Sequence, residues 1–279
     1  MDYRLCYPGF KRKAVTFSYD DGVIQDREVV KILKAHHMRG TFNLNPGKSG
    51  EKKFRLDSSG HEIDCSYLRL EEEKDVYEGM EIANHTFSHP RLEELDFSSQ
   101  KEEFLKGREG LESLFQRKVN GVAYPYGTYD SDTLWIERNL GIEYARTTRS
   151  TYDFALPSNW LLWNPTVHHR DKRIFSVIDD FLASDRELAL LYIWGHGYEF
   201  AIDHDFGLLD DICSRLKDES VCCLTNHEVY CYVNAADSVY YSKKKGCFVN
   251  PSDMDVFLIA DGQRIAVRKN GEYQYEYKE

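Results

Sequence analysis

The sequence predicts an α/β fold, because short apolar runs alternate with amphipathic segments along most of its 279 residues. Each repetition has an apolar run, a turn and a segment with helical spacing, which is the pattern of βα units and a parallel sheet. Seven or eight such units favour a barrel, closed or slightly open, over the competing doubly wound open sheet. The alternation stops after about residue 236 and gives way to short β-like runs.

The first units come from the N-terminal part of the chain. Residues 14–19 form the first expected strand, and residues 26–37 follow with apolar side chains at helical spacing. Residues 40–44 form the next strand. The polar, glycine-containing segment 46–67 then interrupts the pattern, and a long loop of this kind is either functional or an ornamental insertion.

The alternation resumes with a helix from about residue 71. Strands are expected at residues 80–84, 120–124, 142–146, 161–167, 188–194 and 221–224. Helices are expected at residues 97–115, 130–140, 173–183 and 206–217, and a last helix runs toward residue 233 from its cap, Asn226.

The C-terminal part has a different pattern, with hairpin signals at Asp261-Gly262 and Asn270-Gly271. The sequence therefore divides into a (β/α) barrel at residues 1–235 and a small β appendage at residues 236–279 that packs on the barrel. A structural role is expected for the appendage, and glycan binding and dimer formation are alternatives. Its expected strands are residues 238–241, 256–259 and 265–268.

Composition narrows the partners and the compartment. The formal net charge of −11 repels phosphate backbones, so nucleic acid is not an expected partner. The longest apolar stretch, residues 188–194, is far below the ~18 residues that a membrane span needs, and the N-terminus lacks the apolar core of a signal peptide. The seven cysteines are odd in number, and Cys222 and Cys223 are adjacent in an apolar run, which indicates reduced thiols rather than a disulfide framework. The chain is therefore expected in the cytoplasm, without a membrane partner.

Two motifs at expected strand ends indicate a metal. Asp20 and Asp21 close the first strand, where neighbouring carboxylates point to different sides, so that one can bind a metal while the other faces substrate. His85 and His89 follow another strand, and histidines four apart meet on one face of a helical turn. A polar strand terminus and a chance histidine pair are the alternatives. Both motifs would share the active-site face of a barrel.

Two further motifs follow later strands. In residues 124–127, Pro125 and Gly127 shape a turn that can aim a backbone N–H at a developing oxyanion, with a plain turn as the alternative. His196 lies between two glycines just past the strongest strand, either near a ligand or as a satisfied core histidine. Two carboxylates, two histidines and this third histidine together predict a metal hydrolase with a separate acid.

These residues resemble the polysaccharide deacetylase family, also called the NodB-homology domain or carbohydrate esterase family 4. The resemblance covers roughly residues 10–235 and implies a distorted (β/α) barrel with its site at the carboxyl ends of the strands. Residues 16–22 resemble the family's TFDDG motif, and residues 85–89 match H-[ST]-x-x-H. Residues 122–127 resemble the third motif, usually R-x-P-Y, and the strand that leads to His196 resembles the last.

The resemblance also implies roles. Asp21, His85 and His89 would bind a divalent metal, most often zinc, with cobalt, nickel or manganese as alternatives. The metal would lower the pKa of a water and polarise the acetyl carbonyl. Asp20 would be the general base and His196 the acid that protonates the departing amine. The backbone N–H of Tyr126 would stabilise the oxyanion, and the products would be acetate and a free amino sugar.

Two departures from the family pattern need replacements. Ala123 stands where the family usually has an arginine that steadies the base, and Arg146 at the end of another expected strand is a candidate, with a surface salt bridge as the alternative. The carboxylate that usually tunes the catalytic histidine has no obvious counterpart, and Glu199 or Asp203 are candidates. Expected substrate-binding residues are Tyr126, Arg146, Trp163 and Trp194, and His168 is a further pocket candidate.

The predicted function is removal of N-acetyl groups from an acetylated sugar or oligosaccharide. A cytoplasmic location favours a soluble glycan fragment or a small glycoside over a cell-wall polymer. The alternatives are a hydrolase of another small linear or cyclic amide on the same fold, and a catalytically silent carbohydrate-binding protein.

Overall fold

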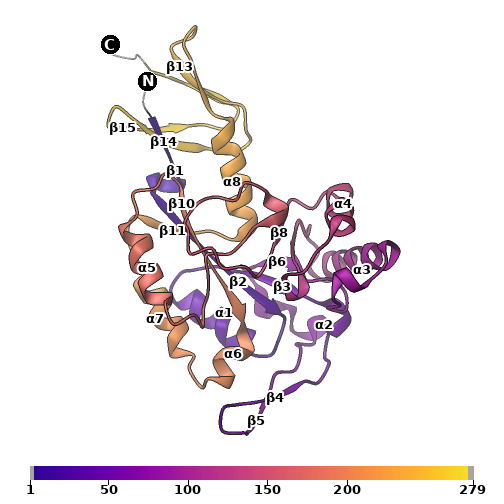
Figure 1. Ribbon diagram of the computed structural model, residues 1–279. Helices are drawn as coiled ribbons and strands as arrows, with labels where there is room; N and C mark the ends of the chain where they lie inside the picture. The colour runs from indigo at the N-terminus through magenta and orange to yellow at the C-terminus, as the bar shows by residue number, and fades with distance from the viewer. Residues whose placement is uncertain (1–2, 276–279) are drawn as a thin grey trace.

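The computed structural model describes residues 3–275, and its centre is a sheet of eight parallel strands in the order β8-β7-β6-β3-β2-β10-β9, with β11 also paired to β2 (Figure 1). The α/β class predicted from the sequence is therefore confirmed. The strands are β2 Lys13–Asp21, β3 Thr41–Leu44, β6 Glu81–Asn84, β7 Gly121–Ala123, β8 Tyr144–Arg146, β9 Val167–His168, β10 Ala189–His196 and β11 Val221–Cys223.

The sheet curls into a distorted barrel, and an extended segment connects its two edges. Trp163 bridges in parallel to Arg146 of β8, where its backbone N–H donates to the carbonyl of Ala145 at 2.9 Å. A few residues later, β9 pairs with β10 on the other side. The chain between β8 and β10 thus closes the barrel, which confirms the distorted barrel and excludes the open doubly wound sheet.

The central strand β2 separates two apolar cores because its side chains alternate between the faces of the sheet. Val15, Phe17 and Tyr19 face the helical layer and belong to the larger core. Ala14 faces the barrel interior, where it packs with aromatic side chains of β8 and β10 and with α8. The carboxyl end of β2, with Asp20 and Asp21, lies at the mouth of the barrel.

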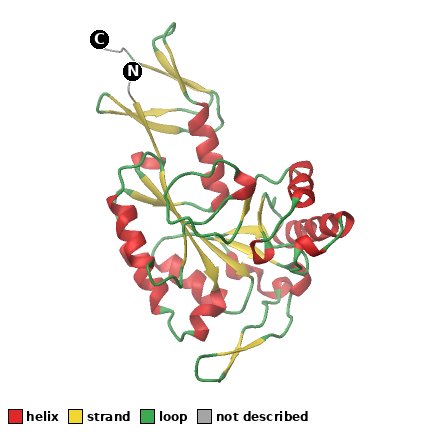
Figure 2. Ribbon diagram, viewed as in Figure 1, coloured by secondary structure: helices red, strands yellow, loops and turns green. Residues whose placement is uncertain are grey.

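Most helices cover the outside of the barrel, whereas α8 packs against the core at one end of it (Figure 2). The longest, α3, begins at its cap Asp96, whose side chain accepts a hydrogen bond from the Ser99 N–H, and spans the residues predicted from the sequence. The helices are α1 Asp26–Ala35, α2 Leu70–Glu73, α3 Phe97–Phe115, α4 Ser131–Leu140, α5 Ile174–Ala183, α6 Gly197–Ile202, α7 Gly207–Arg215 and α8 Asn226–Ser238. The described part of the chain also has six short 3-10 helices, at Pro8–Phe10, Pro46–Lys48, Lys74–Tyr77, Leu92–Glu94, Pro125–Gly127 and Trp160–Leu162.

Three local predictions were wrong for identifiable reasons. The strand expected at 161–167 is a 3-10 turn followed by the short β9, because the Asn159 side chain accepts from the Leu161 N–H and Pro165 has no N–H to donate. Thr225, not Asn226, caps α8, and Asn226 instead contacts Thr16 inside the barrel. The loop 46–67 contains a hairpin, β4 Phe54–Leu56 paired with β5 Glu62–Asp64.

The appendage lies at the opposite end of the barrel from the β4–β5 hairpin, and α8 leads into it (Figure 1). It has two three-stranded antiparallel sheets, and the N-terminal β1 Tyr3–Cys6 belongs to one of them by pairing with β14. The division at residues 235/236 stays a prediction. The remaining strands are β12 Tyr240–Ser242, β13 Cys247–Asn250, β14 Val256–Ala260, β15 Gln263–Val267 and β16 Gly271–Gln274.

Two further features bear on the sequence predictions. All seven cysteines carry free thiols, so no disulfide framework is present, in agreement with the sequence prediction. Within residues 3–275, no helix combines the length and apolar character that crossing a membrane requires.

Candidate active site

The site begins where β2 ends, at two adjacent carboxylates. Asp20 is 2% exposed and Asp21 is 4% exposed, although neither residue type is commonly buried without a partner. The chain turns sharply here, with φ of 79° at Asp21 and 75° at Gly22. A side chain at Gly22 would come within 2.9 Å of Leu44, so glycine is required on both conformational and steric grounds.

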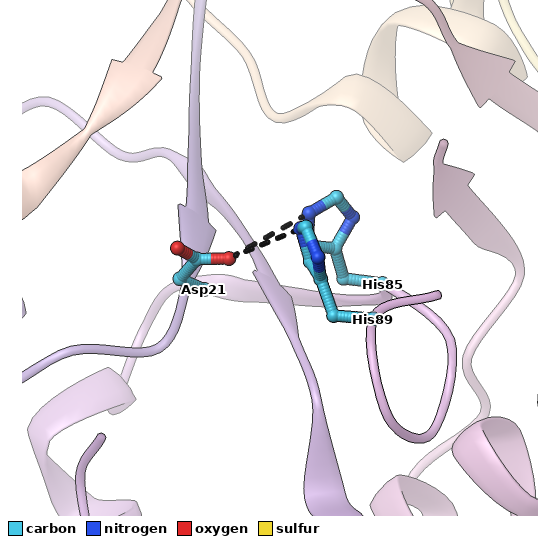
Figure 3. A group of neighbouring side chains, drawn as sticks. All are labelled: Asp21, His85 and His89. Carbon is cyan, nitrogen blue, oxygen red and sulfur yellow. Dashed lines mark ion pairs between the residues drawn. The ribbon is translucent and has the colours of Figure 1, made fainter. Parts of the chain in front are cut away.

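Asp21 faces two histidines from the loop after β6 (Figure 3). Its Oδ1 lies 3.8 Å from Nε2 of His85 and 3.5 Å from Nε2 of His89. The two imidazole rings meet edge to face with their centroids 4.7 Å apart. The loop reaches this geometry through positive φ angles at Thr86 and His89. One carboxylate and two imidazoles therefore converge, with ligand atoms all within 4.8 Å of one another.

The chemistry of these three side chains fits a divalent metal ion. Nδ1 of His85 lies 2.7 Å from the carbonyl oxygen of Ala123, which leaves Nε2 free as a ligand and orients the ring. Asp21 Oδ1 is buried without a hydrogen-bond partner among the described residues. Burial lowers the pKa of both His85 and His89 to about 4, so both rings are neutral and keep the lone pairs that a metal needs.

Asp20 is held on the inner side of the same turn. Arg146 donates to its Oδ2 at 2.5 Å, and Asn43 donates to its Oδ1 at 2.8 Å. Burial raises the pKa of Asp20, but the charges of Arg146 and two histidines and the bond from Asn43 outweigh it, so the pKa is lower than usual. Arg146 is fully buried and stands beside Ala123 in the β7–β8 register, so the neighbouring strand supplies a guanidinium at that level.

His196 ends β10 on the other side of the pocket, beside Glu199. The Glu199 carboxylate accepts from the backbone N–H of His196 at 2.9 Å and lies 3.2 Å from its Nδ1. Burial lowers the pKa of His196, but this bond and the charges of Asp20, Asp21 and Glu199 raise it above its ordinary value. Asp203, the other candidate partner, pairs with Arg170 instead at 2.7 Å.

These groups line one cavity of about 510 Å³. Tyr126 lies on its rim, 52% exposed, in a turn with φ of 59°, and its ring contacts His89. Trp194 forms part of the wall, and its indole nitrogen has no hydrogen-bond partner among the described residues. The cavity is lined by Asp20, Asp21, Lys53, Arg55, His85, His89, Arg91, Tyr126, Thr148, Trp194, His196 and Tyr198.

Three residues expected in the pocket lie outside this described lining. Trp163 is 1% exposed, and its ring packs in the barrel interior against Tyr144 and Tyr192. Arg146 lies behind Asp20 rather than in the cavity. His168 contacts Glu199 at 3.2 Å, beneath His196. Of the expected substrate-binding residues, the structure thus brings Tyr126 and Trp194 to the cavity surface.

Sequence reasoning missed the cationic part of the wall. Lys53 and Arg55 come from the segment around the β4–β5 hairpin, and Arg91 follows the second histidine. Tyr198, from α6, completes this side. A signal was present, because a polar insertion directly after a strand of the active-site face is often functional. The basic residues of this insertion were therefore candidates for the pocket wall.

The family comparison agrees with this geometry. Residues 8–145 match the family model described as polysaccharide deacetylase. This half of the chain belongs to the polysaccharide deacetylase family. The matched region contains Asp20, Asp21 and both histidines, whereas His196 and Glu199 lie beyond it. Among curated proteins, none matches this sequence.

Solved structures of this family share the fold. A family 4 carbohydrate esterase from Streptomyces lividans, in complex with acetate, aligns with a TM-score of 0.50 and 15% identity over 76% of this chain and 92% of that chain. The peptidoglycan deacetylase PdaC from Bacillus subtilis aligns with a TM-score of 0.50 and 17% identity, over 78% and 90%. BA3943, a pseudoenzyme of the same family from Bacillus anthracis, aligns with a TM-score of 0.50 and 15% identity, over 80% and 66%.

Proposed function

We propose that this chain is a metal-dependent hydrolase that removes N-acetyl groups from an acetylated sugar or oligosaccharide. One observation carries the proposal: a carboxylate and two neutral imidazoles converge beside a second, ionised carboxylate in a single cavity. A metal ligand set and a separate base are the parts that hydrolysis of an amide needs. Membership of the deacetylase family makes the acetamido group the expected amide.

Asp21, His85 and His89 are the proposed metal ligands. Two histidines and a carboxylate form a ligand set that zinc uses in hydrolytic sites, so zinc is the proposed ion. When bound, the metal supplies Lewis acidity to the acetyl carbonyl and makes water more acidic. The backbone carbonyl of Ala123 holds the His85 ring in the orientation that this ligand set needs.

Asp20 is the proposed general base. Arg146 keeps its pKa low and its carboxylate fixed, so it is ionised and able to take a proton from the attacking water. The water oxygen then adds to the acetyl carbon. The backbone N–H of Tyr126, in the tight turn at the cavity rim, is the proposed donor to the resulting oxyanion.

His196 is the proposed general acid. Glu199 lies at Nδ1, which leaves Nε2 as the nitrogen that faces the cavity, and the raised pKa keeps the imidazolium available. The C–N bond breaks as His196 gives its proton to the amine. The products are the free amino sugar and acetic acid, which carries the second water proton until it ionises to acetate. The proton held by Asp20 then leaves through solvent, from which His196 regains its own.

A catalytically silent carbohydrate-binding protein is the alternative within this fold, since the family includes at least one pseudoenzyme, BA3943. The complete set of side chains around the cavity favours the enzyme. The deciding experiment measures acetate release from N-acetylglucosamine oligomers by purified protein, before and after chelation and after zinc or cobalt is added back.

Acetate release that chelation stops and metal restores is the expected result. Release that continues unchanged after complete removal of metal would reject metal dependence. No release from any oligomer by metal-loaded protein would reject the sugar deacetylase, and release from small non-sugar amides would then identify a hydrolase of another amide.

A further inference from the structure

Three cationic side chains line the candidate active site, although the chain as a whole carries a net charge of −11. Lys53 and Arg55 come from the hairpin segment inserted after β3, and Arg91 comes from the loop after His89. They approach the cavity from two separate parts of the chain. The polysaccharide deacetylase chemistry proposed above does not use any of them.

Aromatic rings hold these cations in position. The guanidinium of Arg55 lies 4.2 Å from the ring centre of Tyr198, and that of Arg91 lies 4.3 Å from the ring centre of Tyr126. Lys53 donates to the hydroxyl of Tyr67 at 3.2 Å. Cation–π contacts of this kind fix a charged group without neutralising it. The cations are thus directed but still available to an anion.

The hairpin segment that carries two of them is anchored to the barrel at its base and at its turn. Val23 bridges to Tyr67, and the Gln25 side chain donates to the carbonyl of Asp64 at 2.6 Å. Further out, Asp57 lies 2.8 Å from Nε2 of His204, which follows α6. These contacts give the insertion a defined position over the cavity, as a binding element requires.

The carboxylates of the cavity do not balance these cations. Asp20 is already paired with the buried Arg146 at 2.5 Å. Asp21 is a proposed metal ligand, and only its outer oxygen approaches Lys53, at 3.8 Å. Arg55 forms no ion pair with any described residue, and its Nε is buried without a hydrogen-bond partner. Among the described residues, Arg91 forms ion pairs only with Glu93 and Glu94 at the rim, at 3.6 and 4.0 Å.

We infer that the substrate of this site carries an anionic group, a carboxylate or a phosphate on an N-acetylated sugar, which Arg55 binds together with Lys53 and Arg91. The inference rests on the proposed function, because it names the substrate class of the same cavity. The planar guanidinium of Arg55 has no ion-pair partner among the described residues, and its donors suit carboxylate and phosphate oxygens. A neutral sugar would leave the three cations of the cavity wall without a counter-charge.

The kinetic test compares three matched sugars: N-acetylglucosamine, N-acetylmuramic acid, which carries a carboxylate, and N-acetylglucosamine 6-phosphate. We expect kcat/KM to be about 10- to 100-fold higher for at least one anionic sugar, the range of one charge-assisted hydrogen bond. The preference should lie mainly in KM. The anionic sugar with the higher kcat/KM shows whether the bound group is a carboxylate or a phosphate.

Arg55→Gln is the test variant and Lys52→Gln the matched control. Lys52 lies on the same segment, but its side chain is 69% exposed and approaches Asp64 rather than the cavity. Arg55→Gln should reduce the anionic-to-neutral ratio of kcat/KM by about tenfold or more, whereas Lys52→Gln should keep it. Equal values of kcat/KM for the anionic and neutral sugars in the wild-type chain would overturn the inference. An anionic-to-neutral ratio that Arg55→Gln does not change would overturn it as well.

A binding measurement separates this inference from the proposed function. Calorimetric titration of the metal-loaded wild-type chain with glucosamine, muramic acid and glucosamine 6-phosphate needs no turnover. Tighter binding of an anionic sugar that Arg55→Gln removes would support the anion site even if no acetate were released. Acetate release with no preference for anionic sugars in either assay would keep the deacetylase and reject the anion site.

Discussion

The two ends of the barrel each carry a cluster of histidine and carboxylate side chains, but the clusters differ in how their nitrogens are used. At the carboxyl ends of the strands, His85 and His89 face Asp21. At the opposite end, beside the starts of β6 and β8, His227 of α8 lies between Glu143 and Cys231. Both clusters have ligand atoms within 4.8 Å, so proximity alone does not distinguish them.

The hydrogen bonds do distinguish them. Nε2 of His227 lies 2.6 Å from the Glu143 carboxylate, 2.9 Å from the Asn120 amide and 3.3 Å from the Cys231 sulfur. The bond with Cys231, together with the charges of Cys231 and Glu81 and the bond with Glu143, raises the pKa of His227 to about 9. Its imidazole is therefore protonated, whereas His85 is neutral and keeps Nε2 free.

The comparison teaches that a metal site needs free lone pairs as well as the correct residue types. Burial of two rings at the mouth of the barrel makes neutral ligands, and half-burial of His227 beside Glu143 makes an ion pair that ties α8 to the start of β8. The first arrangement can take up a cation, and the second already contains one. Four predictions test this contrast.

The largest effect is expected from His85→Ala, which should abolish metal binding, while His227→Ala should leave it unchanged. Loss of one of three protein ligands weakens binding by more than the about 10- to 100-fold that loss of an outer-sphere partner costs. Metal per chain is counted by mass spectrometry after zinc loading and desalting. Full occupancy in the His85→Ala protein, or an empty His227→Ala protein, would place the metal at the other end.

Asp20→Asn should lower kcat by about 10²- to 10⁴-fold while the metal stays bound, because the variant removes the base and keeps the three ligands. The same measurement of metal content accompanies the acetate assay. Normal turnover in this variant would remove the base assignment. Loss of metal together with activity would mean that Asp20 also belongs to the ligand set.

Glu199→Gln should lower kcat by about tenfold or more and leave the metal bound, since the carboxylate raises the pKa of His196 and holds its ring. Without this carboxylate the pKa of His196 falls, so the imidazolium loses its proton, and the enzyme its acid, at a lower pH as the pH is raised. The basic limb of the kcat profile should therefore move to lower pH. Asp203→Asn, which removes a partner of Arg170 instead, is the control and should keep the wild-type profile.

The smallest effect concerns stability at the other end. The folded pKa of His227, about 9, lies above its unfolded value of about 6.5, so its contribution is complete below about pH 6.5 and disappears as the pH passes about 9. After allowance for solvent screening we expect about 1 kcal/mol.

Urea denaturation of the wild type and His227→Gln at several pH values measures this contribution. The free energies of unfolding should differ at pH 6 and converge near pH 10, with the metal centre occupied throughout. A constant difference between the two proteins across this range would contradict the ion pair.

Much of the fold was predictable because its signals are local. The apolar alternation of β2 and the spacing and cap of α3 depend on neighbours in the sequence, and both elements lie where they were expected. The hairpin β4–β5 was not predicted, since its short strands are largely exposed and lack an apolar pattern. Pairing of β1 with β14 joins the two ends of the chain, which no local pattern can indicate.

The sequence by itself determined the residues that meet at the mouth of the barrel. Asp21 ends one parallel strand and His85 and His89 follow another, and the carboxyl ends of parallel strands share one edge. Their convergence is therefore a consequence of strand order and local motifs. The family resemblance rests on these same short segments, so the sequence alone carries it.

Only the tertiary structure decided which distant side chains complete the site. Arg146 reaches Asp20 across 126 positions of the chain, because the curl of the sheet brings β8 over the end of β2. The same curl turns Trp163 into the barrel core, and the inserted hairpin brings Arg55 over the cavity. Such contacts depend on register, curvature and side-chain direction, which arise from packing of the whole chain rather than from any one segment.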